Sequence, residues 1–490
     1  MSSPTSVLYA PATISSAPGD TTTSHRPYAI IFPDTGKDSK VHIFKVRVDN
    51  SDVKPVPVQI GNLALSSGSL LCHSQFAQTD MTDPETTFAL LNLAGPDGTC
   101  GNSDDVNVII NYKDDSSMAP VTLTPRDYYF STIYDQTHQL QGIVQNDAAN
   151  HKIVFYQDKS FTNPVTLITG TNYYSSMMWS SPFLWDDYPP AGYDFLVTNN
   201  TNNTQSVWRV TSAGVALKTY DGQVPTVPLT NYFMKISAES SDSVFAVDQP
   251  ANYNIGTVNL IQQPRVGGPP LTLYSFPLPQ AQIGSFGAQT SIRNLQIIGS
   301  SLYYLVDKLG AGNSSLESVP IGEVSTSSVT IKQYAEHIFY LTYNYPAGDN
   351  RNGLFAINLD NYDPTQLNPI HSVSSEVFRP DGTAVLSKTP DSASFAAFDG
   401  STQLLFQIRN ITAVDGGYGG GTLNLVDAMG GTAIPFHLSN GDIFKVPSGQ
   451  IMFVGLYSSG VGIGSLYDVG AGGDGKLVLL DLKTHLAVPF

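Results

Sequence analysis

The feature that most constrains the fold is a hairpin that recurs along the chain: an apolar strand, a polar loop of variable length, and a second apolar strand entered through Gly or Ser. Two-residue alternation of apolar and polar side chains predicts β-strands from about residue 28 to residue 490, and no segment has convincing helical periodicity. Nine such hairpins can be read, at 41–61, 106–113, 151–170, 193–214, 243–261, 302–322, 338–359, 404–426 and 451–482. Because a lone hairpin cannot bury its apolar face, the units must stack or close into a ring.

Antiparallel units that repeat every 45 to 60 residues or so fit the blades of a β-propeller. In this hairpin rhythm, residues 28–490 resemble the broad class of bacterial extracytoplasmic propeller proteins of the WD40, YncE and TolB-like kinds, although no WD dipeptide or other blade signature repeats. The resemblance implies an all-β fold, a β-propeller of seven or eight blades of antiparallel strands, in one domain. Stacked β-sandwiches are the alternative. Residues 1–27, rich in Ser, Thr, Pro and Ala, predict a flexible linker or tether.

Charge and composition limit the partners and indicate the compartment. The net charge of −17 repels phosphate backbones and anionic lipids, which argues against nucleic acid as a partner. No run approaches the roughly 18 apolar residues of a membrane span. Scarce Lys and abundant Ser, Thr, Asn, Gly and Tyr are typical of exported proteins, so we expect an extracytoplasmic monomer: periplasmic, at the outer-membrane surface or secreted. Because Met1 is followed by polar SSPTS, we expect that a leader has been removed.

The chain has two cysteines, Cys72 and Cys100. An even number permits one disulfide, which would close a loop of roughly 28 residues and stabilise the fold by about 3 kcal/mol on the chain-entropy model. Two unrelated buried thiols are the alternative.

An acidic, Gly-containing loop, GPDGTCGNSDDV, occupies residues 95–106. It resembles the acidic GPDG-x-x-G-T-x-DD turns of secreted bacterial proteins. Carboxylate and amide oxygens are ligands that Ca²⁺ favours, which predicts a structural Ca²⁺ site formed by Asp97, Asn102, Asp104 and Asp105. The alternative is a tight turn held by hydrogen bonds from its own backbone to its side chains.

Aromatic residues gather at 172–195, next to two carboxylates. Flat rings stack on the C–H faces of sugars, and carboxylates accept sugar hydroxyls, so this run is a candidate ligand site. Its residues are Trp179, Trp185, Asp186, Asp187 and Tyr188. The alternative is that the rings pack between blades and that the acidic segment is a turn.

Local signatures of catalysis are missing from the sequence. There is no haem motif, no P-loop and no GxSxG or HExxH motif, and the Gly cluster 416–421 precedes a strand rather than the helix that a nucleotide site needs. We therefore predict a non-enzymatic binding or scaffold module of the bacterial cell envelope, lipoprotein-like if its N-terminal tether is anchored, that recognises a protein or a glycan at the cell surface through propeller loops. The alternative is a propeller-type polysaccharide hydrolase or lyase that uses Asp186 or Asp187 as acid or base.

Overall fold

The computed structural model describes residues 28–35, 40–48, 57–64, 71–79, 86–93, 97–99, 106–113, 121–122, 130–134, 140–147, 152–156, 164–169, 173–174, 192–199, 204–211, 216–220, 235–239, 242–248, 257–264, 269–277, 289–309, 314–346, 349–361, 372–414, 417–427, 432–458, 460–468 and 476–489. The chain divides into two compact units, Met1–Val224 and Pro225–Phe490. Among the described residues no helix is found, and thus none long and apolar enough to cross a membrane.

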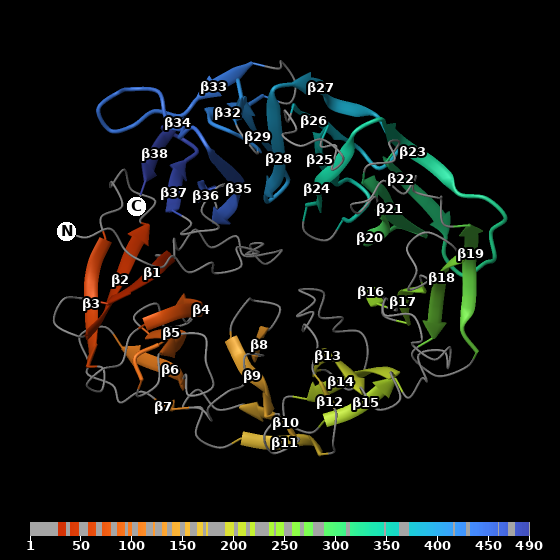
Figure 1. Ribbon diagram of the computed structural model, residues 1–490, viewed down its shortest axis with the longest axis horizontal. Coiled ribbons are helices and arrows are strands. Elements are labelled where there is room, and N and C mark those ends of the chain that lie inside the picture. The colour runs from red at the N-terminus through yellow and green to blue at the C-terminus, as the bar shows by residue number, and fades with distance from the viewer. Residues whose placement is uncertain are drawn as a thin grey trace. The chain divides into compact units, whose positions relative to one another are not determined.

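The first unit contains four antiparallel sheets whose strands pair in chain order (Figure 1). The first sheet has three strands and the other three have four. Their strands are β1 (Tyr28–Thr35), β2 (Lys40–Val48), β3 (Pro57–Ala64); β4 (Leu71–Thr79), β5 (Thr86–Leu93), β6 (Val106–Lys113), β7 (Val121–Thr122); β8 (Phe130–Tyr134), β9 (Leu140–Asp147), β10 (Lys152–Tyr156), β11 (Pro164–Thr169); β12 (Tyr173–Tyr174), β13 (Gly192–Asn199), β14 (Thr204–Thr211), β15 (Ala216–Tyr220).

The second unit continues the same pattern through five sheets, named below by their first and last strands. One sheet has a fifth strand, β34, beside β32, and a short hairpin, β30–β31, interrupts its chain order. The strands are β16 (Lys235–Glu239), β17 (Ser243–Asp248), β18 (Thr257–Pro264), β19 (Leu271–Pro277); β20 (Gln289–Ile298), β21 (Ser301–Leu309), β22 (Ser314–Pro320), β23 (Val329–Tyr334); β24 (His337–Asn344), β25 (Leu354–Asp360), β26 (Val373–Phe378), β27 (Ala384–Pro390); β28 (Ser392–Asp399), β29 (Thr402–Arg409), β30 (Thr412–Val414), β31 (Gly417–Gly419), β32 (Gly421–Val426), β33 (Ala433–Pro435), β34 (Lys445–Val446); β35 (Gln450–Ser458), β36 (Val461–Asp468), β37 (Lys476–Asp481), β38 (Leu486–Pro489).

Burial within the second unit shows which strands are covered on both faces. Every residue of β25 and of β26 is buried, whereas the fourth strand of the same sheet, β27, is largely exposed. A strand buried on both faces is rich in apolar residues, as LFAINLD is in β25, where Asn358 and Asp360 are the polar exceptions. Sheets in this unit therefore stack face to face and leave their fourth strands at the rim.

Apolar clusters fill the spaces between consecutive sheets of this unit. Leu305 and Leu316 of sheet β20–β23 share a cluster with Ile357 and Phe378 of sheet β24–β27. The next cluster joins that sheet to sheet β28–β34, and the largest joins sheet β28–β34 to sheet β35–β38. Aromatic rings such as Phe406 are among the largest fully buried side chains.

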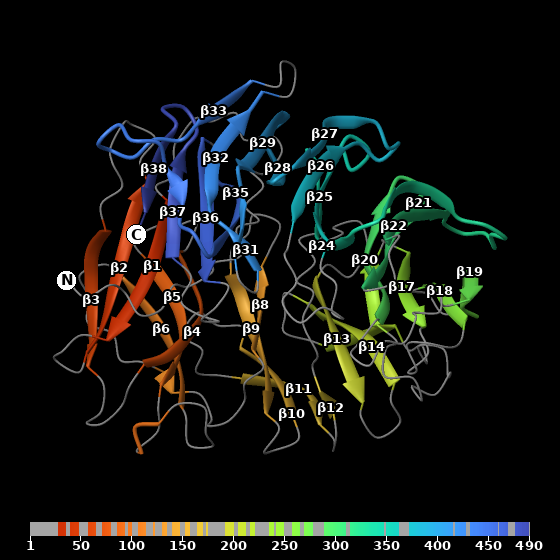
Figure 2. The ribbon, with the colours of Figure 1, turned by 45° about the horizontal axis from the view of Figure 1, so that its top comes forward.

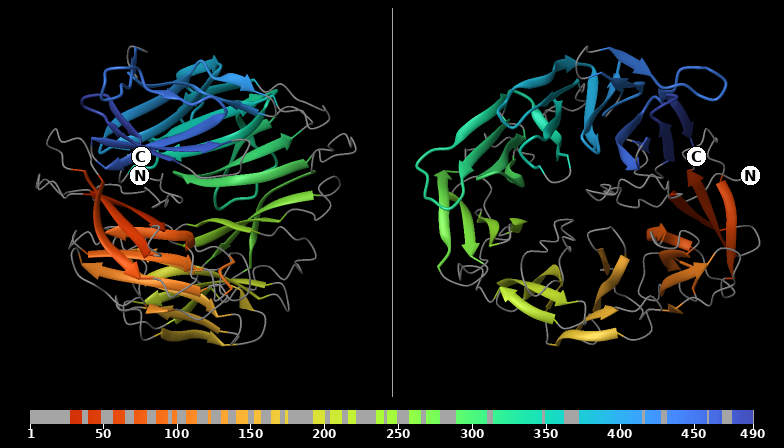
Figure 3. Two further views of the ribbon diagram at one scale, coloured as in Figure 1. Left: turned by 60° about the vertical axis from the view of Figure 1, so that its left-hand side comes forward. Right: turned by 180° about the vertical axis from the view of Figure 1, so that it is seen from behind.

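Tight turns join the first and second strands of several sheets. Gly299 and Gly400 each open a two-residue loop and have φ of 57° and 59°, a backbone conformation that residues with a Cβ rarely adopt. Figures 2 and 3 show the strands of these sheets from further sides.

Four-stranded antiparallel meanders repeated in chain order are the blades of a β-propeller, so the predicted all-β propeller class is confirmed. The described strands form nine sheets of three or more strands, and the blade number of seven or eight stays a prediction. Residues 1–27, predicted as a linker, lie outside the described residues, and the single domain 28–490 also stays a prediction.

Candidate functional site

Of the four predicted Ca²⁺ ligands, Asp97 lies in the described part of the chain. It is exposed, and its Oδ1 accepts a hydrogen bond of 2.8 Å from the backbone N–H of Thr99 across Gly98, which has a φ of 69°. Asn102, Asp104 and Asp105 lie outside the described residues. The Ca²⁺ site therefore stays a prediction.

A second copy of the sequence Pro-Asp-Gly-Thr occurs at 380–383, where it joins β26 to β27. Its geometry matches the turn at 96–99. Asp381 Oδ1 accepts from Thr383 N at 2.9 Å, and Gly382 has a φ of 85°. Hydrogen bonds from Thr383, the backbone one first, lower the pKa of Asp381. Hydrogen bonds within the turn thus explain the aspartate of this tetrapeptide without a cation. The same explanation is the alternative given above for Asp97.

The other predicted site residues are not placed. Trp179, Trp185, Asp186, Asp187 and Tyr188 lie outside the described residues, as does Cys100. The backbone of Cys72 is in β4, but its side chain is not described. The aromatic ligand site and the disulfide both stay predictions.

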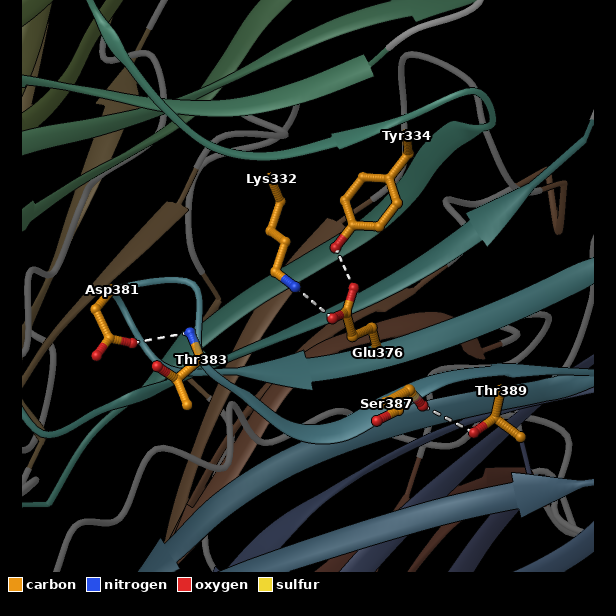
Figure 4. A network of polar contacts seen from close by, with 7 residues as sticks. All are labelled: Lys332, Tyr334, Glu376, Asp381, Thr383, Ser387 and Thr389. Atoms are coloured by element: carbon orange, nitrogen blue, oxygen red, sulfur yellow. Dashed lines mark hydrogen bonds and ion pairs between the residues drawn. The ribbon is translucent and has the colours of Figure 1, made fainter.

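A polar cluster that sequence reasoning missed joins two sheets of the second unit (Figure 4). Glu376, in β26, is buried. Its Oε1 lies 2.6 Å from Lys332 Nζ, and its Oε2 accepts a hydrogen bond of 2.7 Å from the Tyr334 hydroxyl. Lys332 and Tyr334 belong to β23 of the preceding sheet and are two residues apart, so their side chains share one face of that strand.

This cluster is called here the Glu376 clamp (Lys332, Tyr334 and Glu376). The ammonium group of Lys332 also lies 5.1 Å from the centre of the Phe378 ring. Burial, and then the hydrogen bond to Glu376, raises the pKa of Tyr334 well above its ordinary value, so the phenol remains a donor. Because both carboxylate oxygens already accept donors from the chain, the clamp suits bracing two sheets rather than proton transfer to a substrate.

A second acid, half-buried in an equivalent third strand, is held in a similar way. Glu317, in β22, accepts hydrogen bonds from the hydroxyls of Tyr304, Ser315 and Ser328 at 3.0, 2.8 and 2.6 Å. Burial, followed by the charge of Glu317, raises the pKa of Tyr304. The sequence does contain a signal for both acids. Each is the single acid in a strand of otherwise small and apolar residues, SSLESVP or VSSEVF, and an acid in such a covered strand needs a partner.

An amide pair joins sheet β24–β27 to sheet β28–β34. Asn358 Nδ2 donates to the carbonyl of Ser394 at 3.1 Å, and Asn358 Oδ1 accepts from Ser394 N at 2.7 Å. Asn344 Nδ2 donates to the carbonyl of Ala396, two residues along β28, at 2.8 Å. These amides satisfy peptide groups on the edge of β28 that faces away from β29.

The described part of the chain contains no group of three or more His, Cys, Asp or Glu residues that could hold a metal ion. What it does contain is a set of polar groups at sheet interfaces, and those of Glu376 and Asn358 are satisfied by partners within the chain. These contacts brace neighbouring sheets against one another.

Comparison with known proteins adds little beyond the fold. No protein-family model and no curated protein matches the chain. Similar solved structures include a puromycin-hydrolysing peptidase of Mycobacterium tuberculosis (11% identity, TM-score 0.35, 81% of this chain and 56% of that one). A protein described as TolB from Agrobacterium tumefaciens (11%, 0.28, 56% and 83%) and an α-L-arabinanase of Penicillium chrysogenum (9%, 0.32, 60% and 91%) are also similar. The chain spans little more than half of the peptidase, and its assignment as a β-propeller protein rests on its own sheets.

Proposed function

We propose that the chain is a non-enzymatic binding or scaffold module of the bacterial cell envelope, located outside the cytoplasm, that recognises a protein or a glycan through one set of its inter-strand connections. The observation that carries this proposal is the uneven length of those connections in the second unit. First and second strands are joined by only two residues at 299–300 and 400–401. Second and third strands are separated by longer stretches, such as 249–256 and 361–372.

The long second-to-third connections belong to one end of the sheets. In a four-stranded meander, the second-to-third connection lies at the opposite end from the other two. Sheets β20–β23, β24–β27 and β28–β34 keep the same polarity, since the short links Ala335–Glu336 and Asp391 lead from a fourth strand into the next first strand. The sequences of three long connections, QPANYNIG, NYDPTQLNPIHS and NITAVDGGYGG, combine Tyr with Asn and Gly, the residue types that recognition loops favour.

Substitutions in the long connections test the proposal. Full-length chain is screened on a glycan array and by cross-linking on intact bacteria, and the same screen is repeated with Tyr253, Tyr362 and Tyr418 all changed to Ser. We expect the triple variant to lose binding while its circular dichroism is unchanged. A matched control changes Glu323 and Val324, exposed in the connection β22–β23 at the other end, to Ser. Binding that survives the triple variant but not the control would contradict the proposal.

The alternative, a polysaccharide hydrolase or lyase, uses Asp186 or Asp187 with nearby aromatic subsites. Release of reducing ends from a panel of cell-envelope and plant polysaccharides, abolished in a double variant Asp186→Asn and Asp187→Asn, would establish it in place of the binding module. No release from any member of the panel supports the binding module.

We also propose a structural Ca²⁺ in the 95–106 loop and a disulfide between Cys72 and Cys100. A cation that binds only the folded chain raises its melting temperature, so a chelator should lower that temperature and added Ca²⁺ should restore it. Mass spectrometry of peptides from the non-reduced chain tests the disulfide, since a cross-linked Cys72–Cys100 peptide pair is expected.

A further inference from the structure

A small internal cavity lies in the second unit, where sheets β24–β27 and β28–β34 meet the first strand of sheet β35–β38. Its free space is about 10 Å³. Most of its wall is apolar, and the two side-chain amides in the wall are those of Asn358 and Gln450. Among the apolar wall residues are Phe395, Ile408 and Met452.

Gln450 is a half-buried residue of this wall. The Oε1 atom of its side chain is buried and has no hydrogen-bond partner among the described residues. Its backbone is fully used, since its N–H donates to the carbonyl of Pro447 at 3.1 Å and its carbonyl accepts from Gly420 N at 3.1 Å. A buried amide oxygen without a donor costs about 1 to 3 kcal/mol, so this position favours a small molecule that can donate to it.

Close backbone contacts hold the main chain of Gln450 in place. A Cβ at Gly419 would come within 2.7 Å of both the nitrogen and the carbonyl oxygen of Gln450, so only glycine allows β31 to approach β35 this closely. Gly420, next in the chain, has a φ of 80° and continues the contact. Because both neighbours are backbone, the Gln450 main chain cannot move away to relieve its side chain.

The second amide in the wall has hydrogen-bonding capacity to spare. Asn358 uses one Nδ2 hydrogen and one Oδ1 lone pair in its pair with Ser394, which leaves one donor and one acceptor site. A space of this size holds one water molecule and excludes an organic ligand, and an ordered internal water needs two or more polar partners. We propose that the cavity is a specific site for one water molecule, which donates to Gln450 Oε1 and hydrogen-bonds the Asn358 amide, so that it links sheet β24–β27 to sheet β35–β38.

The test uses the full-length chain in two measurements. A high-resolution crystal structure should show ordered density at hydrogen-bond distance, roughly 2.5 to 3.0 Å, from Gln450 Oε1. In solution, magnetic relaxation dispersion of water counts long-lived internal waters. Gln450→Leu, which keeps the side-chain bulk and removes the acceptor, should lower that number by about one. Gln333→Leu, at an exposed position of β23, should leave it unchanged.

Ordered density at Oε1 together with the loss in Gln450→Leu supports the site. A wild-type crystal structure without density there overturns the proposal, as does an unchanged water count in Gln450→Leu. If that variant does not fold, the wild-type density alone decides.

Discussion

Replacing Tyr334 with Phe removes one hydroxyl from the Glu376 clamp and changes little else. The hydroxyl donates to a buried carboxylate at 2.7 Å, and a hydrogen bond to a charged group contributes about 1.5 to 3 kcal/mol. The ring itself packs in the apolar cluster with Ile338 and Phe355, and Phe preserves that packing. We therefore expect Tyr334→Phe to lower the free energy of unfolding of the second unit by about 1.5 to 3 kcal/mol, a factor of about 10 to 100 in the equilibrium constant.

Hydrogen exchange measured by mass spectrometry is the suitable assay. All three Trp residues, at 179, 185 and 208, fall in the first unit, so tryptophan fluorescence reports on that unit and serves as an internal reference. Peptides that cover β23 and β26 should exchange about 10- to 100-fold faster in the variant. The unfolding transition seen by tryptophan fluorescence should be unaffected.

The control is Tyr274→Phe. Tyr274 is half-buried and stacks on Phe276 at 5.2 Å, and its hydroxyl makes no hydrogen bond within the described part of the chain, so the change in stability should stay within about 0.5 kcal/mol. Equal effects of the two substitutions would refute the reasoning, because removal of any tyrosine hydroxyl would then explain the result. Unchanged exchange in Tyr334→Phe would show that the clamp contributes nothing to stability.

Three further predictions concern the turns, the amide pair and the tyrosines. Gly382→Ala places a residue with a Cβ in the left-handed region at a φ of 85°. Urea unfolding should show a loss of stability of about 1 to 2 kcal/mol. Gly455→Ala, where a Cβ has open space, is the control and should change little. Asn358→Leu leaves the N–H and carbonyl of Ser394 unpaired, so exchange of β28 peptides should report a loss above about 2 kcal/mol. Thr402→Leu, at an exposed position where β29 begins, is the control. Burial raises the folded pKa values of Tyr304 and Tyr334. The stability that these phenols contribute is therefore fully present below the unfolded pKa of about 10 and is lost as pH rises toward the folded pKa values. Tyrosinate absorbance should then appear together with unfolding.

The sequence predicted hairpins well and sheet partners poorly, for a physical reason. The hairpin at 302–322 appears as β21 and β22, and the one at 338–359 as β24 and β25, because two-residue alternation and turn residues are local signals. Rim strands such as β27, AVLSKTP, are mostly exposed, so no apolar pattern marks them. The Glu376 clamp joins residues 42 and 44 positions apart in different sheets, and no local pattern encodes such a contact.

The polar contacts between sheets explain how a repeated fold of this kind maintains one order of sheets. Apolar faces built from Val, Leu, Ile and Phe can pack against one another in many combinations with similar energy. The polar partners differ at every interface of the second unit: Gln262 with Gly322 N, Glu376 with Lys332 and Tyr334, Asn358 with Ser394, and Asp399 with Gly460 N. A sheet packed against the wrong neighbour would leave the buried groups of Asn358 and Glu376 without partners, at a cost of about 1 to 3 kcal/mol for the amide and more for the carboxylate. Non-interchangeable polar pairs therefore favour the native order of the sheets even where the apolar cores alone would not distinguish one neighbour from another.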